Sequence, residues 1–160
     1  MSNSILTIAE CRNEAIHFIE MNNLNIFLIN EYLENDKSGT VNFRQYNLCR
    51  NIMFDSIYKE SLYYQDANRS ANWFRCIEDQ VYKLIKHDEH YREDAIHVHM
   101  VLGGAVSGLT GFLMENFSID AAVAVGISYF LIYTITRIGL HAWCQKYEED
   151  RKIDNGDKKR

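Results

Sequence analysis

The sequence predicts an all-α protein, in which an N-terminal cytosolic bundle of about four helices precedes a C-terminal two-helix transmembrane hairpin. Three observations lead to this fold class. The 160 residues contain no proline, which favours long uninterrupted helices over β-sandwiches or barrels. Apolar side chains recur at three- and four-residue steps through the N-terminal part of the chain. Towards the C-terminus, two strongly apolar runs are separated by a short polar link.

The cytosolic bundle begins with two helices. Ser4 to Met21 places its isoleucines and alanines mainly on one side, which predicts an amphipathic helix. Asn22 and Asn23 interrupt this pattern and can cap a short second helix, Leu24 to Glu34, whose apolar residues lie on more than one face. The segment Asn35 to Gly39 collects turn-forming residues and is predicted to be a loop.

Two longer helices complete the bundle. The third should start near Thr40 and run to about Gln65, because aromatic and aliphatic side chains form a stripe at helical spacing. After a turn at Asp66 to Ser70, a near-heptad apolar seam predicts the fourth helix, and no glycine or proline interrupts it before Gly103. This helix either runs straight into the first membrane helix or ends at a joint near His90 to Asp94.

The predicted hairpin occupies residues 95–144. Ala95 to Met114 comprises twenty residues without formal charge, and Ala121 to Thr136 comprises sixteen more, continuing past Arg137 to Cys144. Each run can cross a bilayer, since a span needs roughly 20 mainly apolar residues at about 1.5 Å rise each. The six-residue link between the runs permits only an antiparallel return, so both flanks must lie on the same side of the membrane.

An alternative for this stretch is a buried hairpin within a soluble helical bundle. Five glycines in the two apolar runs and polar residues such as Ser107 and Thr110 dilute its hydrophobicity. Glycine costs a soluble helix interior roughly 0.8 to 1 kcal/mol, whereas small residues promote close packing of membrane helices. We therefore expect a membrane hairpin.

The chain thus divides into a cytosolic helical domain (1–94), the hairpin (95–144) and a charged tail (145–160), which is predicted to be frayed helix followed by disorder. Lysines and arginines flank the hairpin on both sides, whereas the link carries only Glu115 and Asp120 as formal charges. The positive-inside rule then predicts an inner-membrane protein with two spans and both termini in the cytoplasm.

Composition argues against several classes of function. A net charge of −5, without a basic stripe, argues against a DNA-binding protein. The four cysteines are scattered, with no C-x-x-C pair, and are expected to be reduced thiols. The sequence lacks a nucleophile with an adjacent base, a glycine-rich phosphate loop and paired catalytic carboxylates. We therefore expect neither an enzyme nor a bound cofactor.

Small residues predict how the hairpin packs. They lie at three- and four-residue steps on both membrane helices, where they allow close backbone approach. One small-residue face would close the hairpin and the other would contact a second subunit, so self-association is expected. The residues are Gly103, Gly104, Ser107, Gly108, Gly111, Ala122 and Gly126.

A second set of hairpin residues is ionisable. If the helices fold back at the link, Arg137 returns to the depth of His99, and His141 to just outside His97. These four side chains would form one polar layer near the cytoplasmic interface. Arg137 would either reach lipid phosphates or belong to an ionisable ring at the inner mouth of a pore.

The segment before the hairpin is rich in histidines and acids. His87, His90, Asp94 and His97 share one helical face, a spacing suited to a divalent metal. It matches no named metal motif, and a solvated, pH-sensitive collar at the membrane is the preferred interpretation.

The same segment contains Arg92 and His97, separated by four residues. This pair resembles the R-x4-H pattern of HEPN ribonucleases, and the resemblance implies RNA cleavage by the arginine and histidine of two protomers. The residue after the arginine is Glu93, an acid that would repel phosphate and that departs from the usual polar residue of that pattern.

Three functions follow from these patterns. The favoured one is an oligomeric inner-membrane effector, whose helical head controls a membrane module that perturbs or permeabilises the bilayer. Its layout is similar to that of small two-transmembrane effectors in bacterial antiviral defence. An unidentified cytosolic protein or small molecule would be its trigger. The alternatives are a membrane-anchored protein-binding or exclusion protein and a membrane-tethered HEPN-like ribonuclease.

Overall fold

The structure is a computed structural model that describes residues 6–22, 24–38, 42–60, 73–87 and 98–158. These residues form helices and no strands, which confirms the predicted all-α class. The helices are α1 (Ile8–Met21), α2 (Ile26–Ser38), α3 (Phe43–Glu60), α5 (Trp73–Lys86), α6 (Val98–Phe117), α7 (Ala121–Ile138) and α8 (Leu140–Lys158).

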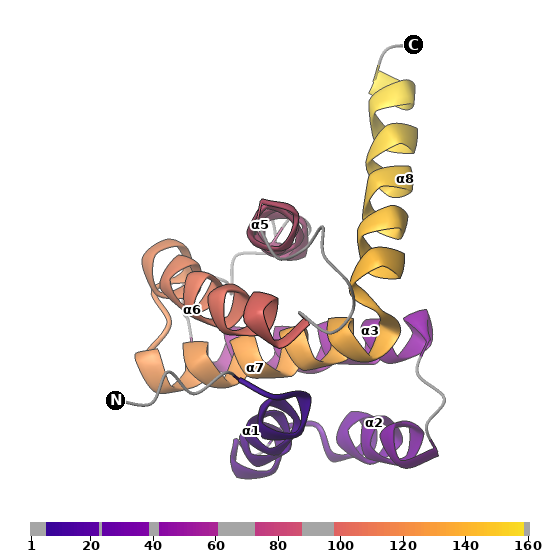
Figure 1. Ribbon diagram of the computed structural model, residues 1–160. Coiled ribbons are helices and arrows are strands. Elements are labelled where there is room, and N and C mark those ends of the chain that lie inside the picture. Colours follow the sequence, from indigo (N-terminus) through magenta and orange to yellow (C-terminus); the bar gives the residue numbers. More distant parts are fainter. Residues whose placement is uncertain (1–5, 23, 39–41, 61–72, 88–97, 159–160) are drawn as a thin grey trace.

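Helix α7 lies at the centre of the molecule. In Figure 1 it crosses the middle of the view, with α1 and α2 below it, α5 and α6 above it and α3 behind it. Its backbone lies close to those of α1, α3, α6 and α8, and side chains of α2 also contact it. Because α7 is apolar on all sides, it gains most by being surrounded. Its residues from Gly126 to Ile135 are all buried except Tyr129, which is partly buried.

Helices α6 and α7 form an antiparallel pair joined by residues 118–120. Ser118 makes the reversal with a positive φ of 52°. Asp120 caps α7, since its carboxylate accepts a hydrogen bond from the Ala122 amide at 3.2 Å. Phe117 and Ile119 are 2% and 4% exposed, so apolar contacts fix both sides of the turn.

The N-terminal helices share one core with this pair. Helix α1 packs along α7, and α5 packs against α6. The predicted separation of a cytosolic domain ending at residue 94 from a membrane hairpin beginning at residue 95 remains a prediction, because the segment 88–97 lies outside the described residues. The predicted turn at Asp66 to Ser70 and the joint near His90 to Asp94 lie outside them as well.

Two expectations about local structure are wrong. The predicted loop from Asn35 belongs to α2 as far as Ser38, because Asp36 is held by side chains of other helices. The tail is not frayed from Gln145 onwards: α8 continues to Lys158, and Tyr147 and Arg151 anchor it to Asp79 of α5.

The second apolar run is also divided. Helix α7 ends at Ile138, and α8 starts at Leu140 in a new direction (Figure 1). Gly139, between them, has a φ of 114°, which is accessible to glycine at little cost. Its amide donates to the Ile135 carbonyl at 2.9 Å and closes the last turn of α7. Residues beyond Ile138 therefore do not extend the apolar helix.

Candidate functional site

Helix α7 is the part of the structure that bears on the predicted membrane hairpin. Among the described residues it is the one helix that is long and apolar enough to cross a membrane, over all 18 residues from Ala121 to Ile138. In the bundle, 56% of these residues are buried. The second predicted span is not shown by the structure and remains a prediction.

One side of α7 is covered by α1, and the contact is close. A Cβ atom placed on Gly126 would lie 2.2 Å from Cδ1 of Phe18. The Cys11 thiol donates to the Tyr129 carbonyl at 3.5 Å. The outer side of α1 carries exposed charged side chains, including Glu14 and Glu20. Since such charges are costly in hydrocarbon, this arrangement keeps α7 away from lipid on the α1 side.

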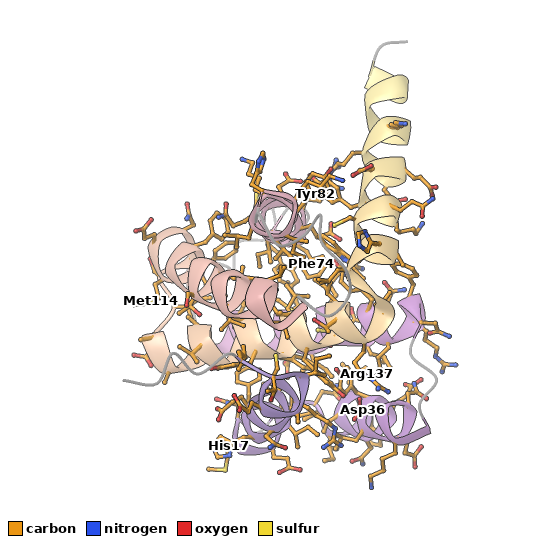
Figure 2. All side chains as sticks on the ribbon, viewed as in Figure 1. His17, Asp36, Phe74, Tyr82, Met114 and Arg137 are labelled. Carbon is orange, nitrogen blue, oxygen red and sulfur yellow. The ribbon has the colours of Figure 1, made fainter. Side chains whose placement is uncertain are left out.

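A buried carboxylate ties α7 to the N-terminal helices. Asp36 on α2 has a side chain that is only 3% exposed. Its Oδ2 accepts a hydrogen bond from Nε of Arg12 on α1 at 3.0 Å, and its Oδ1 accepts one from the Tyr133 hydroxyl on α7 at 2.5 Å. Nε of Arg137, also on α7, lies 3.8 Å from Oδ1, and Nη2 of Arg137 donates to the Asp36 carbonyl at 3.4 Å. Figure 2 shows Asp36 and Arg137 facing each other between α2 and α7.

We call Arg12, Asp36, Tyr133 and Arg137 the Asp36 latch. Both guanidinium groups reach solvent, with side chains 41% and 32% exposed, whereas the carboxylate does not. Burial disfavours the charged form of Arg12, but the hydrogen bond and charge of Asp36 outweigh this and raise the Arg12 pKa. A buried carboxylate needs such partners, because an unpaired charge in a core costs several kcal/mol, on the order of 3–5. The latch therefore stabilises one position of α7 against α1 and α2.

A second polar contact joins α2 and α7, one turn of α2 before Asp36. The Tyr32 and Thr134 hydroxyls are 2.6 Å apart, and both side chains are buried. Nε2 of Gln45 on α3 donates to the Tyr32 carbonyl at 2.9 Å, which adds α3 to the connection. Thr134 Oγ1 also donates to the Phe130 carbonyl, so its hydroxyl is satisfied within α7. These directional contacts fix the rotation of an otherwise apolar helix.

The predicted small packing residues fall into two groups. Gly108 and Gly126 face other helices of the same chain, since an added Cβ would lie 2.4 Å from Cδ2 of Leu84 on α5 or 2.2 Å from Cδ1 of Phe18 on α1. The others line open surface: Gly103 and Gly111 have no atom within 4 Å of an added Cβ, and Gly104, Ser107 and Ala122 are exposed. Their predicted role in membrane packing is not tested by these positions.

The predicted polar layer is described only in part. Arg137 lies in the latch, and His141 is exposed on α8. His99 belongs to α6, but its side chain, like all of His97, lies outside the described residues. The latch was missed in the sequence because Asp36 stands among turn formers. The signal that could have found it is the presence of two cations, Arg12 and Arg137, beside apolar helical stripes, since each needs an anionic partner.

The metal and ribonuclease alternatives rest on residues that the structure does not describe, namely His90, Arg92, Asp94 and His97. His87 is exposed just after α5. Within the described ranges, no three histidine, cysteine or acidic side chains are grouped to hold a metal ion.

Comparisons with protein-family models, curated proteins and solved structures found no match for this chain.

Proposed function

We propose that this chain is a small membrane-active effector whose helical bundle keeps the α6–α7 hairpin covered until a trigger releases it. After release, the hairpin enters the inner membrane and, as an oligomer, perturbs or permeabilises it. The observation that carries the proposal is the central place of α7, a helix able to cross a bilayer but surrounded here by α1, α3, α6 and α8.

The way in which α1 and α2 are attached to α7 supports this proposal. Helix α1 buries only one face on α7, and its outer face is charged, so it can return to water when it leaves. The cover is also fastened by polar contacts of the Asp36 latch, which depend on direction and distance. Loss of the Asp36 carboxylate would weaken the attachment of α2 to both α1 and α7.

The hairpin itself is suited to a membrane after release. Ser128, Thr134 and Thr136 donate their hydroxyls to carbonyls four residues earlier in α7, so these polar groups are satisfied without other helices. Arg137 stands in the last turn of α7, where a long cationic side chain can reach the lipid headgroups. The exposed side of α6 carries Gly104, Ser107 and Gly111 at three- and four-residue steps, a surface compatible with packing against a second hairpin.

The test combines two changes in one protein: a substitution that weakens the Asp36 latch and an engineered disulfide clamp that holds α1 on α7. Asp36→Asn removes the charge that Arg12 and Arg137 share, while Phe18→Cys with Gly126→Cys places two thiols across the α1–α7 contact. Phe18 Cγ lies 2.8 Å from a Cβ on Gly126. Phe18 Cβ is one bond of about 1.5 Å further, so the two Cβ atoms are at most about 4.3 Å apart, within disulfide range. The exposed Cys76 is replaced by serine to prevent intermolecular bridges.

The readout is dye release from vesicles of phosphatidylethanolamine and phosphatidylglycerol. The clamped Asp36→Asn protein should release dye only after reduction, because α1 must leave α7 first. Asp150→Asn, which removes an exposed carboxylate paired with Lys146, is the matched control and should behave like the wild type. The proposal fails if reduced Asp36→Asn protein releases no more dye than this control, or if the oxidised clamp makes no difference. An absence of vesicle association in all variants would favour a bundle that acts by binding another protein.

A further inference from the structure

A groove between α5 and α8 lies apart from the hairpin and its latch. Its volume is about 680 Å³, within the range of roughly 300–1,000 Å³ that small-molecule sites occupy. Tyr82 marks its α5 side in Figure 2, with α8 facing it. The side chains that line the groove are Arg75, Asp79, Tyr82, Lys83, His87, Tyr147, Glu148, Arg151 and Lys152.

The wall of the groove is built from stacked rings. Tyr82 of α5 stacks on Tyr147 of α8 with ring centroids 4.3 Å apart, and Tyr147 stacks on Trp143 at 5.7 Å. The Arg151 guanidinium lies 4.4 Å from the centroid of the Tyr147 ring. This ladder joins the two helices and holds the Tyr82 and Tyr147 rings in the lining of the groove, with the buried Trp143 behind them.

The two carboxylates in the groove are already engaged by neighbouring groups. Asp79 Oδ1 accepts from the Tyr147 hydroxyl at 2.6 Å and from Nη2 of Arg151 at 2.9 Å. Glu148 accepts from the Tyr82 hydroxyl at 2.5 Å and pairs with Lys86 at 3.4 Å. The hydrogen bond to Glu148, followed by burial, raises the Tyr82 pKa to about 12. Burial, and then the hydrogen bond to Asp79, raise the Tyr147 pKa to about 12 as well. Both phenols therefore remain protonated at neutral pH and act as donors to the carboxylates.

Cations remain in excess once these carboxylates are satisfied. The lining contains two arginines and two lysines against two acids, although the chain as a whole carries a charge of −5. The side chains of Lys83 and Lys152 are exposed, and neither ammonium group makes a hydrogen bond or close ion pair with another described residue, although the charge of Lys152 acts on Glu148. Arg151 is held in place by Asp79 and Glu78, so its charge is fixed beside the aromatic wall.

We propose that the α5–α8 groove binds a phosphorylated anion, with Lys83, Lys152 and Arg75 around the phosphates and a planar group of the ligand beside Tyr82. Phosphate groups are recognised by clustered lysine and arginine side chains, and aromatic rings bind the flat faces of bases. The same phosphate chemistry occurs in a soluble nucleotide and in an anionic lipid headgroup, and the aromatic wall favours the nucleotide. The site goes beyond the proposed membrane activity and does not depend on it.

Binding is measured by titration calorimetry on the purified full chain, with ATP and inorganic pyrophosphate as probes. Lys83→Gln and Lys152→Gln should each weaken the binding of both probes about tenfold, which corresponds to one charge-assisted contact. Lys37→Gln on α2 is the matched control, because Lys37 is exposed and α2 lies on the other side of α7 from the groove (Figure 1). It should change the affinity less than about twofold, the size of a screened long-range effect.

The role of the ring is tested separately. Tyr82→Leu should weaken ATP binding more than pyrophosphate binding, whereas Tyr82→Phe keeps the ring and should preserve the ratio of the two affinities. Phosphatidylglycerol vesicles that compete with pyrophosphate through the same lysines, while ATP does not bind, would identify a lipid headgroup as the source of the phosphate. The proposal is overturned if ATP, pyrophosphate and the vesicles all fail to bind when each is present at a millimolar concentration of phosphate groups. It is equally overturned if Lys37→Gln weakens binding as much as the groove variants.

Discussion

Replacing Gly126 by alanine tests the packing on which the proposed function depends. The added methyl group would lie 2.2 Å from Cδ1, 2.8 Å from Cγ and 3.0 Å from Cε1 of Phe18. Ordinary carbon contacts are about 3.5–4.0 Å, so the ring or the whole of α1 has to shift. Phe18 is 4% exposed and packs on Phe130 with centroids 6.2 Å apart, which leaves its ring little room to turn away.

Two opposing contributions set the size of the effect. Overfilling a packed contact costs about 1–3 kcal/mol. Alanine also stabilises a helix interior by about 0.8–1 kcal/mol relative to glycine. Gly111→Ala is the matched control, since Gly111 is helical and an added Cβ there meets nothing within 4 Å. The helix contribution is common to both variants, so Gly126→Ala should be less stable than Gly111→Ala by the packing cost of about 1–3 kcal/mol.

The measurement is urea denaturation of purified protein, followed by circular dichroism. Phe18→Leu supplies a second control, because Gly126→Ala should cost less when the ring is absent, and a double-mutant cycle gives the coupling between the two positions. Equal stabilisation by Gly126→Ala and Gly111→Ala would refute the reasoning. It would mean that α1 does not lie on α7, as expected if the hairpin were permanently in lipid.

Three further predictions concern contacts elsewhere in the bundle. Burial raises the pKa of Glu78, so folding favours the protonated form of this side chain. The stability of the wild type relative to Glu78→Gln should therefore be greatest below a pH of about 4.5 and should fall as the pH rises through the pKa of the folded protein. Urea denaturation between pH 4 and 7 measures this difference. Gly139→Ala forces a side chain onto a backbone with φ of 114° and should cost about 1–3 kcal/mol. An unchanged melting temperature would contradict the change of chain direction between α7 and α8. Tyr32→Phe removes the hydrogen bond between the Tyr32 and Thr134 hydroxyls, but Thr134 still donates to the Phe130 carbonyl. The free energy of unfolding, measured by urea denaturation, should therefore fall by only about 1 kcal/mol. A fall of more than about 3 kcal/mol would show that the Tyr32 hydroxyl has a larger role.

The sequence alone was sufficient for properties that depend on neighbouring residues. The helical class followed from apolar spacing and the absence of proline, and both are local features. The apolar run after the link formed a helix from Ala121, capped by Asp120 as a short polar residue can do. The reversal between the two apolar runs needed only a short polar link.

Tertiary contacts decided where local preferences were overridden. Turn formers around Asp36 became the end of α2, because the carboxylate binds Arg12 and Tyr133 from distant parts of the chain. The charged tail became α8, because Tyr147 and Arg151 find Asp79 on α5. Helix propensity differences are below about 1 kcal/mol for most residues, so a few such contacts are enough to change the outcome.

For α7, too, the sequence determined one property and the tertiary structure another. Hydropathy measures how strongly a helix avoids water, and this quantity is the same whether the helix is covered by lipid or by protein. Small residues likewise permit another helix to approach closely, but they do not predict which helix it is. In the structure the neighbour of Gly108 is Leu84 and that of Gly126 is Phe18. The sequence therefore determined that α7 must be covered. Only the tertiary structure showed that α1 and α3 cover it together with α6, because contacts between residues so far apart leave no periodic pattern along the chain.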